Sequence, residues 1–276
     1  MGIDKLKLAG AIKICMLGFY LIYFIFFNTS LIIYLPENKN NDVLIKKNLI
    51  GDYCILIIGG SNVRQGISAK LISKSVCPTL NLGVNGELGK FDLYIKWLEQ
   101  NLDGRKYDSI LYSPALFWYE KSIINESSNI IKLPEISIFT QLKNFTMVDP
   151  ISIFNSQGDI NNYVCNSDFL SFSIKEENFS NANILVSQEL NRRISEINSI
   201  LKAKNLYVRV PPVYIKNKKQ AELYTNLMNK RIEILKEFGV KVISTTIVST
   251  DSSLFCDSFH PNAKGREVFS KEIILP

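Results

Sequence analysis

The chain has 276 residues, 46% hydrophobic and 21% charged, which fits one sizeable globular domain with an appendage. Half of its net charge of +6 comes from residues 1–50, and no basic stripe interleaved with aromatic residues follows, so we expect no nucleic-acid partner. A single histidine and five cysteines without a C-x-x-C pair argue against a metal site, and we predict neither a metal nor another cofactor.

The N-terminal segment reads as a membrane anchor. The 21 residues from Ile14 to Tyr34 carry no formal charge, and as a helix they would be about 32 Å long, enough to cross a bilayer. A cleaved signal peptide is one alternative, but no A-x-A site follows. A buried core helix is another, but the run is apolar on every side. We predict that residues 1–35 form an uncleaved, single-pass anchor in the cytoplasmic membrane, with the N-terminus inside and the rest of the chain outside.

Residues 36–50 are polar and rich in asparagine and predict a short tether to a domain at 51–276. In this domain, predicted strands alternate with predicted helices, while residues 120–185 are irregular and predict an insertion that covers the site or binds a partner. The strands are expected at 53–59, 79–82, 109–112, 206–210 and 240–244. The helices are expected at 67–76, 90–102, 187–201, 220–238 and 262–273. This alternation indicates an α/β fold with a parallel sheet covered on both faces.

The cysteines do not fix the redox compartment. Cys15 lies in the apolar N-terminal segment and Cys54 in a predicted buried strand. A bridge between Cys165 and Cys256 fits a location outside the cytoplasm, but spacing alone does not establish it.

A serine follows the first predicted core strand, in the sequence Gly59-Gly60-Ser61-Asn62. Open α/β sheets bind ligands beyond the carboxyl ends of their strands, so this serine can face a substrate. An ordinary turn in which the serine caps a helix is the alternative. A phosphate-binding loop is a further alternative, but its G-x-x-x-x-G-K-[ST] pattern is absent here. An α/β-hydrolase nucleophile would need G-x-S-x-G deeper in the chain, so that fold is rejected.

The single histidine lies in Asp257-Ser258-Phe259-His260-Pro261, before the last predicted helix. The D-x-x-H spacing lets Asp257 accept a hydrogen bond from Nδ1 of His260 and leaves Nε2 facing a substrate. A surface acid–histidine pair is the alternative. After the second strand, the glycines of 81–86 allow a backbone N–H to serve as an oxyanion donor, unless this is a plain Gly/Asn turn.

Together, these motifs resemble those of the SGNH (GDSL-like) hydrolase superfamily. Ser61 matches the nucleophile of its first sequence block, Gly86 the oxyanion glycine of its second, and Asp257 and His260 the D-x-x-H of its fifth. The resemblance spans residues 53–273 in the expected order. It implies a flavodoxin-like, three-layer α/β/α sandwich with a Ser-His-Asp triad.

One position departs from the family pattern. The third block normally supplies an asparagine as an oxyanion donor, and this chain has Ser113 in that region instead. Ser113, Asn85 and Asn62 are candidates to replace it, beside the amides of Ser61 and Gly86. Losing one such donor costs on the order of 3 kcal/mol of transition-state stabilisation, which leaves room for a specialised transferase or an inactive protein.

Two further residues are candidates for binding substrate: Arg64, which could hold an anionic group, and Asn62. A surface arginine without a role is the alternative for Arg64. With its anchor, the chain resembles proteins that O-acylate cell-envelope polymers such as alginate-type exopolysaccharides, which implies a membrane-bound acyltransferase as partner. We therefore expect O-acetyl transfer onto, or removal from, a surface polysaccharide. A non-catalytic glycan-binding or assembly subunit is the second hypothesis.

Overall fold

The computed structural model describes residues 49–84, 91–102, 104–118, 155–160 and 179–275, together with residues 18, 32–34, 46, 146–148 and 165. Its central sheet has five strands: β2 (Ile55–Gly59), β3 (Thr79–Asn81), β4 (Ser109–Ser113), β6 (Asn205–Val208) and β8 (Lys241–Val242). They lie in the order β3-β2-β4-β6-β8, and every neighbouring pair is parallel. Counted along the chain, this is the 2-1-3-4-5 order of flavodoxin-like folds. The predicted parallel sheet is confirmed.

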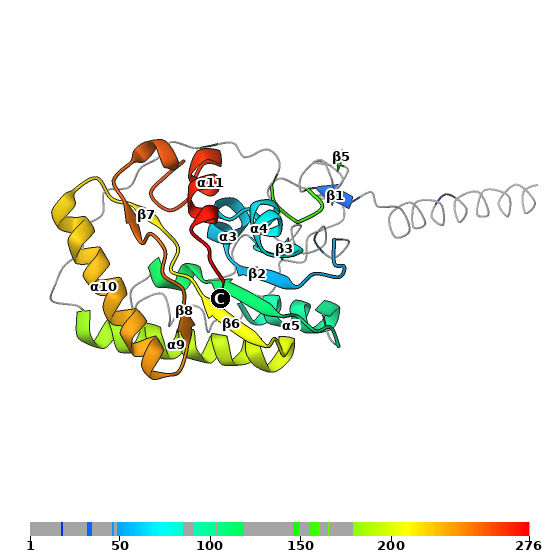
Figure 1. Cartoon of the computed structure of the whole chain (residues 1–276), viewed down its shortest axis with the longest axis horizontal. Coiled ribbons are helices and arrows are strands. Elements are labelled where there is room, and N and C mark those ends of the chain that lie inside the picture. The colour runs from blue at the N-terminus through cyan, green and yellow to red at the C-terminus, as the bar shows by residue number, and fades with distance from the viewer. Residues whose placement is uncertain are drawn as a thin grey trace, which may run out of the picture.

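Helices cover both faces of this sheet (Figure 1). One face carries α3 (Ser61–Gly66), α4 (Ala69–Ser75) and α11 (Ala263–Lys271). The other carries α5 (Phe91–Leu102), α9 (Phe179–Leu201) and α10 (Lys218–Glu237). Successive strand residues point to opposite faces, so β2 sends Leu56 and Ile58 to the α5-α9-α10 core and Ile55 and Ile57 to the smaller core beneath α3 and α4. This double burial explains the uninterrupted apolar sequence of the strand.

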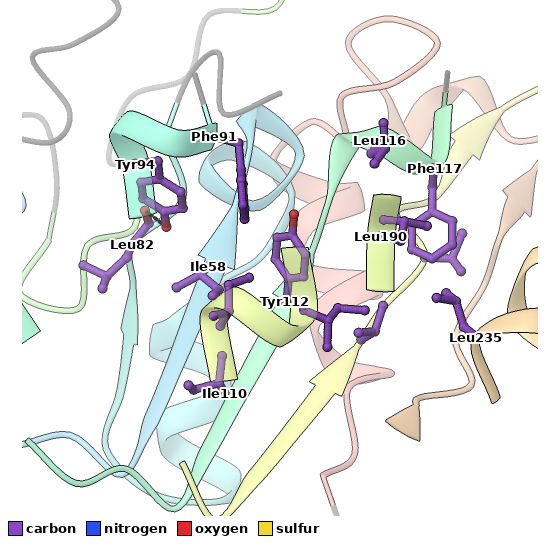
Figure 2. Close-up of a cluster of buried hydrophobic side chains, with 14 of the residues drawn as sticks. Ile58, Leu82, Phe91, Tyr94, Ile110, Tyr112, Leu116, Phe117, Leu190 and Leu235 are labelled. Atoms are coloured by element: carbon purple, nitrogen blue, oxygen red, sulfur yellow. Dashed lines mark hydrogen bonds between the residues drawn. The ribbon is translucent and has the colours of Figure 1, made fainter. Parts of the chain in front are cut away.

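Figure 2 shows part of the larger core, where side chains from the sheet meet those of the helices. Tyr112 of β4 lies among Phe91 and Tyr94 of α5 and Leu190 of α9, and all four side chains are buried. The Tyr94 hydroxyl donates a hydrogen bond of 3.0 Å to the carbonyl oxygen of Leu82. This contact fixes α5 beside the carboxyl end of β3.

A short piece of the predicted insertion, residues 155–160, covers the outer edge of β3. The Asn81 amide donates to the Gln157 carbonyl at 2.8 Å. The Asp159 carboxylate accepts from the first amides of α4 at 2.7 and 2.9 Å. Gly158 has φ +77°, and a Cβ there would lie 2.3 Å from the Asn81 oxygen, so the position requires glycine. The covered edge leaves fewer strand amides open to pairing with another chain.

The predicted membrane span, Ile14–Tyr34, falls mostly outside the described residues. Its last three residues are not helical: they form β1 (Ile32–Tyr34), antiparallel to β5 (Thr146–Val148). Two isoleucines and a tyrosine suit a strand, which accounts for this departure from the predicted helix. Within the described part of the chain, no helix is long and apolar enough to cross a membrane.

Other departures concern the tether and the last third of the chain. Lys46, predicted to lie in the tether, is fully buried, and its Nζ donates to the Asn81 carbonyl at 2.7 Å. Helix α9 begins at Phe179, inside the range predicted to be irregular. A second small sheet pairs β7 (Val213–Tyr214) in parallel with β9 (Val248–Ser249), strands too short for sequence periodicity to predict.

Candidate active site

Ser61 is the first residue of α3, directly beyond the carboxyl end of β2. Gly60 is the N-cap of this helix, so the alternative in which the serine itself caps the helix is wrong. Gly59 has φ +146°, and a Cβ there would lie only 2.4 Å from the Ser113 carbonyl oxygen. Glycine is therefore required for the sharp turn that carries the chain from β2 to Ser61.

The three residues predicted to be catalytic form one hydrogen-bonded chain. Ser61 Oγ lies 2.8 Å from Nε2 of His260, although 199 positions separate the two residues. The other ring nitrogen, Nδ1, donates to Oδ2 of Asp257 at 2.7 Å. With the proton on Nδ1, Nε2 carries a lone pair and accepts the serine hydroxyl. This is the geometry in which an imidazole can remove the proton of an attacking hydroxyl.

The Asp257–His260 turn is shaped by its own backbone. Oδ1 of Asp257 accepts hydrogen bonds from the amides of Phe259 at 2.7 Å and His260 at 2.8 Å. The Cys256 amide donates to the His260 carbonyl at 2.8 Å and closes the turn. Each oxygen of the carboxylate thus has a defined partner, so Asp257 is held in position independently of Ser61.

The turn is docked onto the nucleophile helix. At Gly66, the last residue of α3, a Cβ would lie 3.1 Å from the ring of Pro261, so the two residues are in close contact. The Ser68 amide donates to Oγ of Ser270 in α11 at 2.8 Å. These contacts hold the C-terminal part of the chain against α3 and α4, which brings His260 to Ser61.

The Asp257 carboxyl is held in its ionised form. Burial by itself raises its pKa, but hydrogen bonds from the His260 ring and from the Phe259 and His260 amides outweigh burial, and the pKa of Asp257 lies below its ordinary value. The carboxylate therefore stays negative at neutral pH and can accept the Nδ1 proton of the imidazole.

Asp257 makes folding sensitive to acid. Its pKa is lower in the folded than in the unfolded chain, so it stabilises the fold above the unfolded value of about 4, and this contribution is lost as the pH falls through the folded value. We expect the free energy of unfolding of the wild-type protein to fall, relative to that of an Asp257→Asn variant, as the pH drops below about 4. Urea unfolding between pH 3 and 7 measures this. A difference between the two proteins that does not change with pH would contradict the assignment.

Asn62 and Ser113 lie inside the protein. Asn62 is 2% exposed, and its Nδ2 donates to the carbonyl oxygen of Ser113 at 2.8 Å and to its Oγ at 3.1 Å. Ser113 is fully buried. Together they tie the first turn of α3 to the end of β4. In this arrangement Nδ2 of Asn62 is engaged by Ser113, and neither side chain is exposed at the surface.

Arg64, the candidate to hold an anionic substrate group, is also buried, with 4% of its surface exposed, so the alternative of a surface arginine is wrong. Its backbone nitrogen lies 2.5 Å from where a Cβ of Gly83 would be, which shows how closely the chain after β3 packs on α3. The short helix α3 contacts both β2 and α11, so it buries residues that a surface helix would expose. Asn85 and Gly86, the two remaining oxyanion candidates, lie outside the described residues.

Asn81 positions the residues that follow β3, a role that the sequence motifs did not indicate. Its Nδ2 donates to the carbonyl oxygens of Val63 at 3.1 Å and Ile67 at 2.9 Å, while Oδ1 accepts from the Gly83 amide at 2.9 Å. The fully buried side chain therefore joins α3 to the end of β3.

Two aromatic residues beside His260 were also missed. Trp118 ends the short helix η2 (Ala115–Trp118), and its ring centroid lies 6.0 Å from that of the imidazole, with the planes at 85°. Trp118 also contacts Phe259, at a centroid distance of 4.9 Å. Trp118 could have been predicted to lie near the site because it follows a central strand closely, and the carboxyl ends of such strands meet at the ligand-binding edge of the sheet.

Arg209 places a buried cation at the same edge of the sheet. It follows β6, its amide donates to the Tyr112 carbonyl at 2.9 Å, and its side chain is fully buried. No described residue accepts a hydrogen bond from its guanidinium. Burial lowers the pKa of Arg209 to about 10, against the opposing effect of Glu272, so the group stays charged at neutral pH. A positive charge here makes the electrostatic potential at the carboxyl ends of the strands more positive.

The described residues contain no cluster of three or more histidine, cysteine or acidic residues that could hold a metal ion.

Comparison with known proteins gives distant similarities only. No family model matches the chain, and no curated protein matches it. Among solved structures, a protein from Streptococcus pneumonia proposed to be a platelet activating factor is 14% identical, with 86% of this chain and 92% of that chain covered and a TM-score of 0.48. The acetylxylan esterase Axe2 from Geobacillus stearothermophilus is 12% identical, with 79% of this chain and 90% of that chain covered and a TM-score of 0.43. A catalytic mutant of Axe2 is also 12% identical, with 81% of this chain and 94% of that chain covered and a TM-score of 0.43.

Proposed function

We propose that this protein is an SGNH-type serine acyl-transfer enzyme, an O-acetylesterase or O-acetyltransferase, with Ser61 as nucleophile. His260 acts as base and acid, and Asp257 orients the imidazole. The observation that carries this proposal is the continuous hydrogen-bonded chain from Oδ2 of Asp257 through His260 to Oγ of Ser61. Its position beyond the carboxyl ends of parallel strands, where open α/β sheets bind ligands, supports it further.

The reaction proceeds in two halves. His260 takes the hydroxyl proton as Ser61 Oγ bonds to the carbonyl carbon of an ester, and the imidazole then passes that proton to the departing alcohol oxygen as the ester C–O bond breaks. Ser61 is left carrying the acyl group. A water molecule or a sugar hydroxyl gives its proton to His260 and bonds to the acyl carbon. Oγ leaves and takes the proton back, which restores the starting enzyme.

The negative charge that forms on the carbonyl oxygen needs donors. Among the described residues, the backbone N–H of Ser61 has no acceptor, as expected at the start of a helix, and we assign it as one donor. The Gly86 amide is the second donor by resemblance to the family. The buried cation of Arg209 favours negative charge at the same edge of the sheet.

Features outside the triad support the proposed location, and the resemblance to proteins that O-acylate cell-envelope polymers supports the proposed substrate. The disulfides Cys54–Cys77 and Cys165–Cys256 favour an oxidising compartment. Together with the uncharged segment before Tyr34, they support a domain held on the outer side of the cytoplasmic membrane. The substrate there is an O-acetylated cell-envelope polysaccharide, and a membrane-bound acyltransferase that delivers acyl groups is the proposed partner.

Labelling with a fluorophosphonate tests whether the site is catalytic. An activated serine attacks phosphorus and keeps the probe, so we expect one label per chain, on the peptide that contains Ser61, and none in a Ser61→Ala variant. An unlabelled wild-type protein that also releases no acetate from acetylated polysaccharide would reject the enzyme and favour a non-catalytic glycan-binding subunit. If labelling succeeds, p-nitrophenyl acetate can serve as the acetyl donor, with water alone or water plus deacetylated polysaccharide as acceptor. Acetate as the only product indicates an esterase, and acetylated polysaccharide indicates a transferase.

A further inference from the structure

We propose that Trp118 is a positioning residue that keeps the His260 imidazole aimed while Ser61 carries the acyl group. This inference rests on the proposed function. The indole and imidazole centroids are 6.0 Å apart and the rings stand nearly perpendicular, at 85°. Trp118 also packs against Phe259, the neighbour of the histidine, at 4.9 Å. The indole is therefore in contact with the turn that carries the base.

The indole has a rigid support in a different element from His260. Leu116 and Phe117, which precede it in η2, are buried in the larger core, and Figure 2 shows both side chains there. The Phe117 carbonyl accepts a hydrogen bond of 2.5 Å from Nη1 of Arg231, a buried residue of α10. Trp118 packs against the same core. The backbone that carries the indole is thus held by the larger core and by α10, which are separate from the turn that carries His260.

The second half of the reaction is where such a support matters. Before the reaction, both ring nitrogens of His260 are hydrogen-bonded, one to Asp257 and one to Ser61. Once Ser61 is acylated, Oγ has no hydrogen to donate, and only the bond to Asp257 remains. Nε2 must still meet the hydroxyl of the incoming water or sugar. Contact with Trp118 limits rotation of the ring at this stage, when a displacement of about 1 Å costs on the order of a hundredfold in rate.

Replacement of Trp118 by leucine is therefore expected to slow removal of the acyl group more than its arrival. With p-nitrophenyl acetate, kcat should fall roughly tenfold or more, while kcat/KM should change by less than about threefold, because the acyl-enzyme accumulates and KM falls together with kcat. Rapid mixing should show a burst of about one p-nitrophenol per active site. Trp118→Phe, which keeps an aromatic ring at the site, should restore most of kcat.

The chain offers a matched control, because it contains only one other tryptophan. Trp97 lies on α5 and stacks on Tyr94, with centroids 6.3 Å apart. Trp97→Leu should leave both kcat and KM at their wild-type values. The inference is overturned if Trp118→Leu lowers kcat and kcat/KM equally without acyl-enzyme accumulation, or alters neither. If the wild-type protein neither releases p-nitrophenol nor takes up the fluorophosphonate, the proposed function has failed instead.

A fluorescence measurement keeps the contact testable even if Trp118→Leu folds poorly. In a Trp97→Phe protein, Trp118 is the sole tryptophan, so the emission reports on the ring that this indole contacts. We expect the emission intensity or wavelength of this protein to change when His260→Ala removes the imidazole. Emission that is the same with and without the histidine would show that the indole does not sense His260 and would overturn the inference.

Discussion

Alanine at Ser61 or at His260 is expected to lower acyl transfer by a factor on the order of 10⁴ or more, because neither side chain activates the reaction without the other. The 2.8 Å contact between Oγ and Nε2 is the physical basis of this dependence. Asp257→Ala should leave somewhat more activity, since the histidine base remains present but is less well oriented. Steady-state rates on p-nitrophenyl acetate and on acetylated polysaccharide measure all three losses.

The double variant Ser61→Ala/His260→Ala provides the internal control. If the two residues act as one unit, the double variant is no slower than either single variant, whereas independent contributions would multiply. Ser199→Ala, on the exposed surface of α9, is a matched serine control and should retain full activity. Circular dichroism should show folded protein throughout, since none of the three triad side chains belongs to the hydrophobic core. Full activity in Ser61→Ala would remove the proposed mechanism.

Removal of the Cys165–Cys256 disulfide has the second large expected effect. The bridge joins residues 91 positions apart, and in the chain-entropy model closing such a loop stabilises the fold by roughly 4 to 5 kcal/mol. Cys256 is buried, adjoins Asp257, and closes the turn through its amide bond to the His260 carbonyl. We therefore expect the double variant Cys165→Ala/Cys256→Ala to lose stability in urea and also to have a lower kcat.

The Cys54–Cys77 bridge is the matched control. It joins residues 23 positions apart, for which the same model gives roughly 3 to 3.5 kcal/mol, and Cys54 precedes β2 at the end of the strand away from Ser61. Its removal should lower stability while leaving kcat at its wild-type value under conditions where the protein stays folded. Equal losses of kcat from the two pairs, or a loss from neither, would mean that Cys165–Cys256 has no particular connection to the triad turn.

The order of elements was predictable because strand and helix each impose a strong pattern. The uninterrupted apolar run at 55–58 can only be a doubly buried strand or a buried helix, and the glycines that follow stop it. Gly239 marks the end of α10 and has φ +78°, as its place after the helix predicts. Elements of only a few residues carry too little of either pattern to be recognised. Helix α3, η2 and the β7–β9 pair were missed for this reason, since tertiary contacts alone determine their conformation.

Within the site, sequence spacing could predict contacts only between residues that are close together in the chain. The D-x-x-H spacing predicted the Asp257–His260 contact because both residues belong to one turn. The pairing of Ser61 with His260 across the whole domain came from resemblance to a family and could not follow from local pattern. Burial was the property least visible in the sequence. Asn62 and Arg64 are polar residues of a short helix, yet both are buried because that helix packs against β2 and α11.

The triad is divided between the two ends of the domain, and this division has a consequence for biosynthesis. Ser61 follows the first core strand, whereas Asp257 and His260 lie in the last 20 residues of the chain. A growing polypeptide therefore contains the serine long before its base. In the proposed mechanism, Ser61 lacks its base until α11 has been synthesised and has docked on α3. In this mechanism, the nucleophile therefore becomes reactive only after the segment that carries its base has been added and docked.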